Sequence, residues 1–152
     1  MTRPEFGKML IRGVALFTVI GGFLADWNRT HLFNPNWTPH AKLHDAMTIC
    51  LFACLGITSL ILLAIDKKTT SHNLKLAALL PAFAYFSMVA SFLFPGARGL
   101  ESEFPELIPK IAGIYFNEFF AALFFLGVLA AGYHLAAIRP RRSDQSLTLQ
   151  ES

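Results

Sequence analysis

The chain has 152 residues, of which 54% are hydrophobic and only 15% are charged, and its mean hydropathy is +0.48. A soluble domain usually carries about 25% charged residues, so this composition excludes an ordinary soluble globular protein. The net charge of +3 does not indicate nucleic-acid binding, because the Lys and Arg residues stand at the ends of apolar runs and form no patch interleaved with aromatic residues. We therefore expect one integral membrane domain whose main partner is the lipid bilayer.

Four apolar runs are each long enough, or nearly so, for a membrane-spanning helix, which needs about 20 mostly apolar residues. The predicted helices cover about residues 9–26, 40–65, 73–95 and 109–138, with Pro109 in the first turn of the last one. The first run could also be a signal peptide, but it lacks a small-x-small cleavage site, and we expect an uncleaved anchor. The predicted fold class is all-α, an integral membrane four-helix bundle with up-down topology.

The distribution of basic residues predicts the orientation of the bundle. Nine of the 13 Lys and Arg residues fall in the N-terminal segment, the second connection and the C-terminal segment. The positive-inside rule then places both termini in the cytoplasm, in a bacterial inner membrane. We expect a four-span domain over residues 1–142 and a disordered cytoplasmic tail over residues 143–152. Small residues four positions apart, such as Gly21 and Ala25, favour close helix packing and leave a homo-oligomer open.

The first connection concentrates residues that hydrogen-bond, protonate or coordinate. Its candidate substrate contacts are Asp26, Asn28, His31 and Trp37. If the second helix begins near Pro39, His40 and His44 lie one turn apart on one face. This spacing suits acid–base chemistry and could also place two imidazoles on one metal ion, although no further Cys or His ligand set accompanies them. The alternative is that both histidines are ordinary interfacial residues at a helix end.

Glu118 is the most unusual residue of the fourth apolar run. Counted from Pro109 at 1.5 Å per residue, it would lie about 13 Å along the helix and well inside the hydrocarbon. A carboxylate at that depth is rare and indicates a functional site by default. Tyr115 would share its helix face and Asn117 adjoins it, so both are candidate substrate contacts. The alternative is a structural hydrogen bond between helices or a water-lined vestibule.

Residues 28–44 also contain a distinctive pattern of residue types. The pattern consists of Asn28, His31, Phe33-Asn34-Pro35, Trp37, Pro39-His40-Ala41 and His44. This pattern resembles the signature of a family of small four-span membrane proteins of unknown function. The resemblance implies that these residues form a shared polar site, and it implies no activity.

Three functions are compatible with these features. The first is a membrane-embedded enzyme of the proton-transfer or isomerase type acting on a lipid-like substrate, with Glu118, His44 and His40 as catalytic residues and Tyr115 or Asn28 as a hydrogen-bond donor. The second is a non-enzymatic protein that binds a lipid, a metal ion or a partner membrane protein. The third is a structural subunit. The first is favoured because an intramembrane carboxylate and an imidazole pair fall on the same side of the bilayer; the sequence identifies no cofactor.

Overall fold

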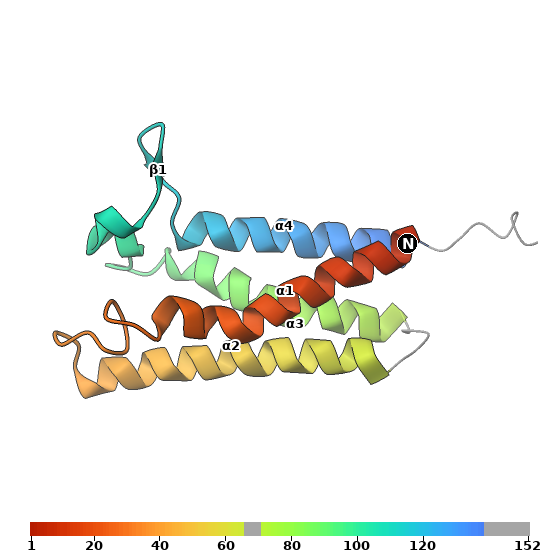
Figure 1. Cartoon of the computed structure of the whole chain (residues 1–152), viewed down its shortest axis with the longest axis horizontal. Coiled ribbons are helices and arrows are strands. Elements are labelled where there is room, and N and C mark those ends of the chain that lie inside the picture. The colour runs from red at the N-terminus through yellow and green to blue at the C-terminus, as the bar shows by residue number, and fades with distance from the viewer. Residues whose placement is uncertain (66–70, 139–152) are drawn as a thin grey trace, which may run out of the picture.

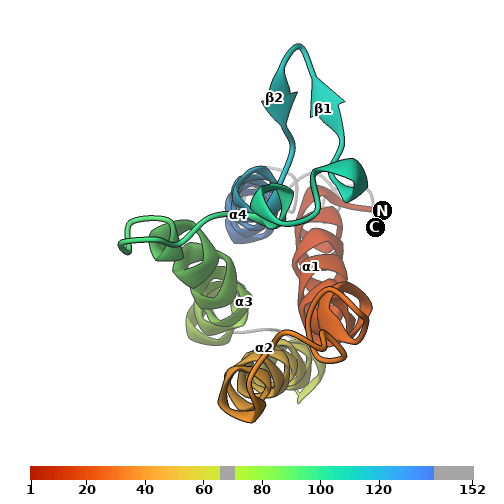
Figure 2. The same cartoon turned by 90° about the vertical axis from the view of Figure 1, so that its left-hand side faces the viewer.

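The computed structural model describes residues 1–65 and 71–138, so the tail expected at residues 143–152 lies outside the described part. Four helices dominate it: α1 (Arg3–Asp26), α2 (Pro39–Ile65), α3 (Ser71–Ser91) and α4 (Glu118–Ala137) (Figure 1). Consecutive helices run in opposite directions, and α4 packs against α1 to close the ring (Figure 2). Each helix is long and apolar enough to cross a membrane, as predicted.

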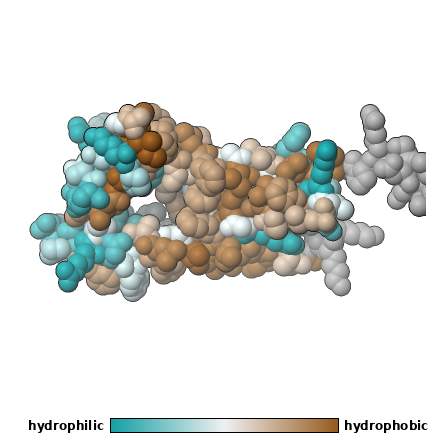
Figure 3. All heavy atoms as spheres, turned by 45° about the horizontal axis from the view of Figure 1, so that its top comes forward, coloured by the Kyte–Doolittle hydropathy of each residue, from teal (hydrophilic) through white to brown (hydrophobic). Residues whose placement is uncertain are grey.

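On the face shown in Figure 3, the surface of the bundle is mainly apolar in its middle part, and hydrophilic residues gather at the end formed by residues 27–38 and 92–117 and in a few places toward the other end. Large side chains such as Leu24, Phe86 and Phe124 point outward and are more than half exposed. A soluble protein rarely exposes contiguous apolar surface on this scale, whereas lipid tails cover such a surface at no cost. The exposed apolar band therefore agrees with the low charge content of the sequence.

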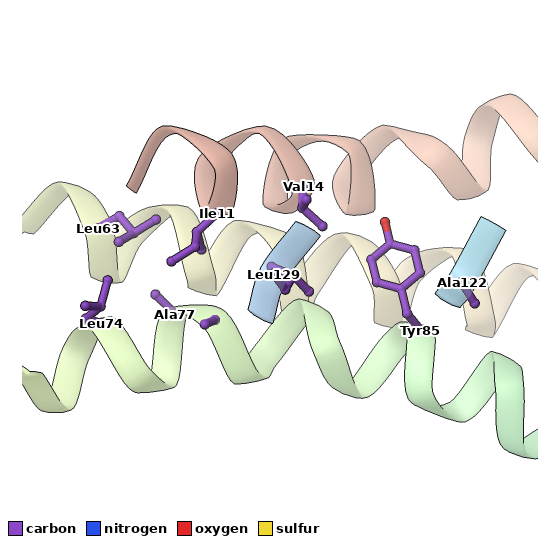
Figure 4. Packing of buried hydrophobic residues seen from close by; sticks show 9 residues of the cluster. Ile11, Val14, Leu63, Leu74, Ala77, Tyr85, Ala122 and Leu129 are labelled. Carbon is purple, nitrogen blue, oxygen red and sulfur yellow. The ribbon is translucent and has the colours of Figure 1, made fainter. Parts of the chain in front are cut away.

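The interior is packed from all four helices (Figure 4). Ile11 of α1, Leu63 of α2, Ala77 of α3 and Leu129 of α4 are buried within one cluster. Glycines set the closest helix approaches: a methyl group at Gly56 would meet the Ala15 carbonyl oxygen at 2.6 Å. Small residues therefore bring the helix backbones together, as membrane bundles require.

A proline inside α3 is compensated by a neighbouring helix. Pro81 has no N–H, so the carbonyl of Ala77, four residues earlier, loses its helical donor. The buried hydroxyl of Ser59 on α2 donates to that carbonyl oxygen at 2.6 Å. This bond satisfies a backbone group that water cannot reach and joins α2 to α3.

The fourth helix begins later than the sequence predicted. Residues 110–115 form a hairpin of β1 (Lys110–Ile111) and β2 (Ile114–Tyr115), which follows two short helical turns, η1 (Leu100–Ser102) and η2 (Pro105–Leu107). The hairpin turn holds Ala112 and Gly113 at positive φ, a conformation that ends any helix begun at Pro109. The predicted start at residue 109 is therefore wrong, and Tyr115 does not share a helix face with Glu118.

The third helix is also shorter than predicted. It was expected to reach residue 95, and it ends at Ser91. The backbone tightens into turns there, with the Leu93 N–H donating to the Ala90 carbonyl oxygen at 3.0 Å, before Pro95 and Gly96 redirect the chain. The last residue of α3 and the first residue of α4 therefore lie at the same end of the bundle as the last residue of α1 (Figure 1).

Candidate functional site

Acidic side chains gather at the end of the bundle formed by residues 27–38 and 92–117, here called the loop end (Figure 1). Asp26 is the last residue of α1, Glu118 is the first residue of α4, and Asp45 lies in the second turn of α2. Asp26 is close enough to the other two carboxylates and to His31 for electrostatic interaction. These three carboxylates and His31 are called the acidic cluster.

His31 is the histidine that the fold brings to this cluster. Its Nε2 lies 3.6 Å from Asp26 Oδ1, and both side chains are 21% exposed. On the opposite edge of the ring, Nδ1 lies 2.7 Å from the hydroxyl of Thr30, and Trp37 packs edge-on against the ring. The imidazole is thus held from two sides with Nε2 turned toward the carboxylate.

The hydrogen bonds of Thr30 assign the tautomer of His31. The Thr30 hydroxyl donates its one proton to Asn28 Oδ1 at 2.6 Å, so it accepts from His31 and places that proton on Nδ1. Neutral His31 then presents a lone pair on Nε2 to Asp26. His31 Nε2 and Asp26 Oδ1 are then both hydrogen-bond acceptors. A proton on either atom turns the contact into a hydrogen bond.

Asn28 and Asn34 hold the backbone of the first connection in place through hydrogen bonds. Asn28 Oδ1 also accepts from the Thr30 backbone N–H at 2.8 Å, which forms an Asx turn. Asn34 is buried, donates to the Thr30 carbonyl oxygen at 3.2 Å and accepts from the Asn36 N–H at 3.0 Å. This network positions Thr30 and, through it, His31.

Glu118 anchors the third connection on the end of α4. Both of its carboxylate oxygens accept from the Leu100 backbone N–H, at 3.1 and 3.3 Å. Its neighbour Asn117 caps the helix by accepting from the Phe119 N–H at 3.1 Å and donates to the Glu101 carboxylate at 2.9 and 3.0 Å. Glu118 is therefore the first residue of α4, and the prediction that it lies about 13 Å along a helix is wrong.

A cavity of about 250 Å³ lies between the four helices beside this cluster. Its wall is mainly apolar, and it runs along α1 from Phe17 to Asp26, a length of about 13 Å at 1.5 Å per residue. Asp26 and Glu118 close it at the loop end. At the deep end Tyr85 stacks on Phe125 and shares a 3.0 Å hydrogen bond with Thr18.

A second cavity of about 270 Å³ adjoins the first at the loop end and is more polar. His31, Trp37 and Arg98 line it, together with Glu103. Glu118 lines both cavities, so its carboxylate stands between an apolar space and a polar one. Such a boundary suits a molecule with one apolar and one polar end.

The structure separates the histidine pair of α2 from the cavities. His40 and His44 are exposed, their Nε2 atoms lie 3.1 Å apart, and neither residue lines a cavity described above. The fold does not bring His44 to Glu118 as a catalytic pair. Within the described ranges 1–65 and 71–138, no three His, Cys, Asp or Glu side chains come together as metal ligands.

The remaining predicted residues divide into two groups. Asp26, His31 and Trp37 line the cavities, whereas Tyr115 lies on the hairpin under the ammonium group of Lys110. Sequence reasoning missed Arg98, which has no distinguishing sequence signal. It also missed Thr18 and Tyr85. Each places a hydroxyl group within an apolar run, and a hydroxyl group there favours the interior of a bundle, where it finds a hydrogen-bond partner.

Comparison with known proteins gives a family and no activity. No curated protein and no solved structure matches the chain. The model of one family, described as a family of unknown function (DUF6640), matches residues 10–146. That match covers most of the chain and agrees with the resemblance to a family without known activity; the protein belongs to the DUF6640 family of unknown function.

Proposed function

We propose that this protein is a multi-pass membrane protein that binds a lipid-like molecule between its four helices. Both termini lie in the cytoplasm, and the loop end faces the opposite side of the membrane, as the basic residues predict. The observation that carries the proposal is the apolar cavity that receives residues from all four helices and ends at Asp26 and Glu118. A ligand's apolar part occupies this cavity, and its polar part reaches the acidic cluster.

The charges at the loop end select the polar part of the ligand. Asp26 interacts electrostatically with Asp45, Glu118 and His31 there, while Arg98 lines only the second cavity. Asp45 Oδ2 is buried and has no hydrogen-bond partner among the described residues. Asp26 and Glu118 line the apolar cavity, so a hydroxyl or ammonium group of the ligand would donate to them, whereas a phosphate or carboxylate would add repulsion. The ligand is therefore a neutral or cationic amphiphile.

Native mass spectrometry tests the binding. The full chain is released from nanodiscs made from the expressing cell's own membranes, and we expect one retained amphiphile per chain. Ala121→Phe projects a ring into the cavity wall, and we expect it to reduce retention at least about tenfold, equivalent to about 1.4 kcal/mol. Ala131→Phe is the matched control, since Ala131 is exposed on the same helix and lines no cavity described here.

Two results would contradict the proposal. One is a wild-type chain that carries no amphiphile from any membrane tested. The other is equal retention by the two phenylalanine variants. In either case the bundle is better described as a structural subunit whose acidic cluster holds the loops in place.

A second candidate function is proton transfer on the bound molecule. It is favoured by the contact between His31 Nε2 and Asp26 Oδ1, which places a base and an acid beside a carboxylate that lines both cavities. General acid–base catalysis contributes about 10²–10⁴-fold to a rate when such groups reach the reacting atoms. In this version His31 takes the role that the sequence assigned to His44.

Deuterium incorporation separates catalysis from binding. The retained molecule is incubated with protein in D₂O, and an enzyme would introduce deuterium at a carbon that does not exchange alone. His31→Asn should reduce that rate by about 10²-fold or more while the ligand is still retained. If the wild type retains the molecule but introduces no deuterium, the binding proposal stands and the catalytic proposal is contradicted.

A further inference from the structure

The two histidines at the start of α2 form an arrangement that the cavities do not explain. His40 and His44 are separated by one helical turn, and both are exposed. Their rings are nearly perpendicular, at 82°, with centroids 4.5 Å apart. The two Nε2 atoms converge to 3.1 Å. The fold therefore presents two ring nitrogens to the same point in space at the loop end.

This separation matches two ligands on one metal ion. A metal–nitrogen bond to imidazole is about 2.0–2.1 Å long, so two nitrogens on one ion lie about 2.9 Å apart at a right angle and about 3.4 Å apart at the tetrahedral angle. The 3.1 Å between the Nε2 atoms of His40 and His44 falls within this range. We propose that these two residues chelate one divalent transition-metal ion of the class that imidazole prefers, represented by Cu²⁺ and Zn²⁺.

The helix preorganises the site. Residues four apart on a helix face lie one above the other, so the backbone already holds both imidazoles in chelating register. Because both rings are exposed, an ion reaches them without any opening of the bundle. In the hydrogen bond between the rings one Nε2 carries a proton, and metal binding requires that this proton moves to Nδ1, so that both Nε2 lone pairs face the ion.

The ion keeps open coordination positions. No third His, Cys, Asp or Glu side chain in the described part of the chain joins this pair as a ligand. Water therefore fills the remaining positions, and the ion stays exchangeable, in contrast to a closed structural zinc site. Neither histidine lines the cavities, so this site is independent of the proposed amphiphile binding.

Titration with Cu²⁺ followed by electron paramagnetic resonance tests the site. The full chain is purified without a polyhistidine tag and placed in nanodiscs. We expect one Cu²⁺ per chain with hyperfine splitting from two nitrogens, and Zn²⁺ should displace it. His40→Gln and His44→Gln should each weaken binding at least about tenfold, since losing even a residue that only orients a metal ligand costs about 10–100-fold.

His72→Gln is the matched control, because His72 is an exposed histidine near the start of α3 at the other end of the bundle. Circular dichroism establishes that all variants keep the same helix content. The proposal is overturned if Cu²⁺ binds equally well to the wild type and to a chain carrying both His40→Gln and His44→Gln. It is also overturned if the copper signal shows one nitrogen only, which would leave the pair as a hydrogen bond between two imidazoles.

Discussion

A short-range hydrogen bond orients His31 within the acidic cluster. The Thr30 hydroxyl is committed to Asn28, and this fixes the proton of His31 on Nδ1. The sequence predicted His40 and His44 as the catalytic histidines because their spacing places them on one helix face. His31 has no such spacing, and its distinguishing feature is the Asx turn before it. That turn is visible in the sequence as Asn28 two residues before Thr30, but its contact with Asp26 depends on the fold.

Gly99 holds the third connection against α4. It is buried, and a methyl group there would meet Asn117 Nδ2 at 2.6 Å and Glu118 Oε2 at 2.8 Å. Gly99→Ala should displace these side-chain ends and break the bond from the Leu100 N–H to Glu118. We therefore expect the Leu100 amide hydrogen to exchange at least about tenfold faster, a change equivalent to about 1.4 kcal/mol of local protection.

Hydrogen-exchange mass spectrometry of the peptide that contains Leu100 measures this effect. Gly127→Ala is the control, because a methyl group at Gly127 meets nothing within 4 Å. Unchanged exchange at Leu100 in Gly99→Ala would show that the carboxylate of Glu118 follows the loop without cost.

Among the elements, the helices were easier to predict than the segment between α3 and α4. Four apolar runs are sufficient to locate four helices, because the bilayer demands length and apolarity within each segment. Pro109 was taken for a helix start, although Ala112 and Gly113 form a turn at positive φ. The docking of residues 99–101 on Asn117 and Glu118 is a contact between distant segments, and no local pattern announces it.

The bond that joins α2 to α3 gives a prediction for a pair of residues. Ser59→Ala leaves the Ala77 carbonyl without a donor and should destabilise the bundle by about 1–3 kcal/mol. Pro81→Ala restores the N–H that the helix lacks at this position. In that background, Ser59→Ala should cost much less, since the carbonyl then has a helical partner.

A double-mutant cycle in detergent measures the coupling. The free energy of unfolding is determined for the wild type, both single variants and the double variant. Additive effects would mean that the Ser59 hydroxyl does not replace the missing N–H. Thr58→Ala serves as a control, because Thr58 is exposed and bonds within its own helix.

For the whole molecule, close approaches at glycine set how the helices pack. The small-residue pairs of the sequence indicated close packing in general, but the tight contacts occur at Gly7, Gly56 and Gly132. The rotation of each helix about its axis decides which glycines contact a neighbouring helix closely. A sequence rich in Gly and Ala does not determine that rotation. The proximity of Asp26 to His31, Asp45 and Glu118 likewise depends on the assembled fold.

Gly56→Ala tests the packing of α1 against α2. The added methyl group would meet the Ala15 carbonyl oxygen at 2.6 Å and the Val19 backbone nitrogen at 3.0 Å, so the backbones must separate. We expect a loss of about 1–3 kcal/mol, as for overpacking of a close-packed core. Thermal unfolding followed by circular dichroism measures it, with Gly13→Ala as a control where the added methyl group meets nothing. Equal melting temperatures for the two variants would argue against a tight crossing.

The helices are unequal in length, and this has a consequence for the surrounding lipid. At 1.5 Å per residue, the 27 residues of α2 span about 40 Å and the 20 residues of α4 about 30 Å, which is close to the thickness of the hydrocarbon core. The excess of α2 projects at the loop end (Figure 1). The residues of α2 that exceed the length of α4 are its polar first turns, which carry His40, Lys42, His44 and Asp45. In a bilayer, these turns would therefore extend beyond the hydrocarbon core into the layer of lipid headgroups, while the apolar remainder of α2 matches the length of α4.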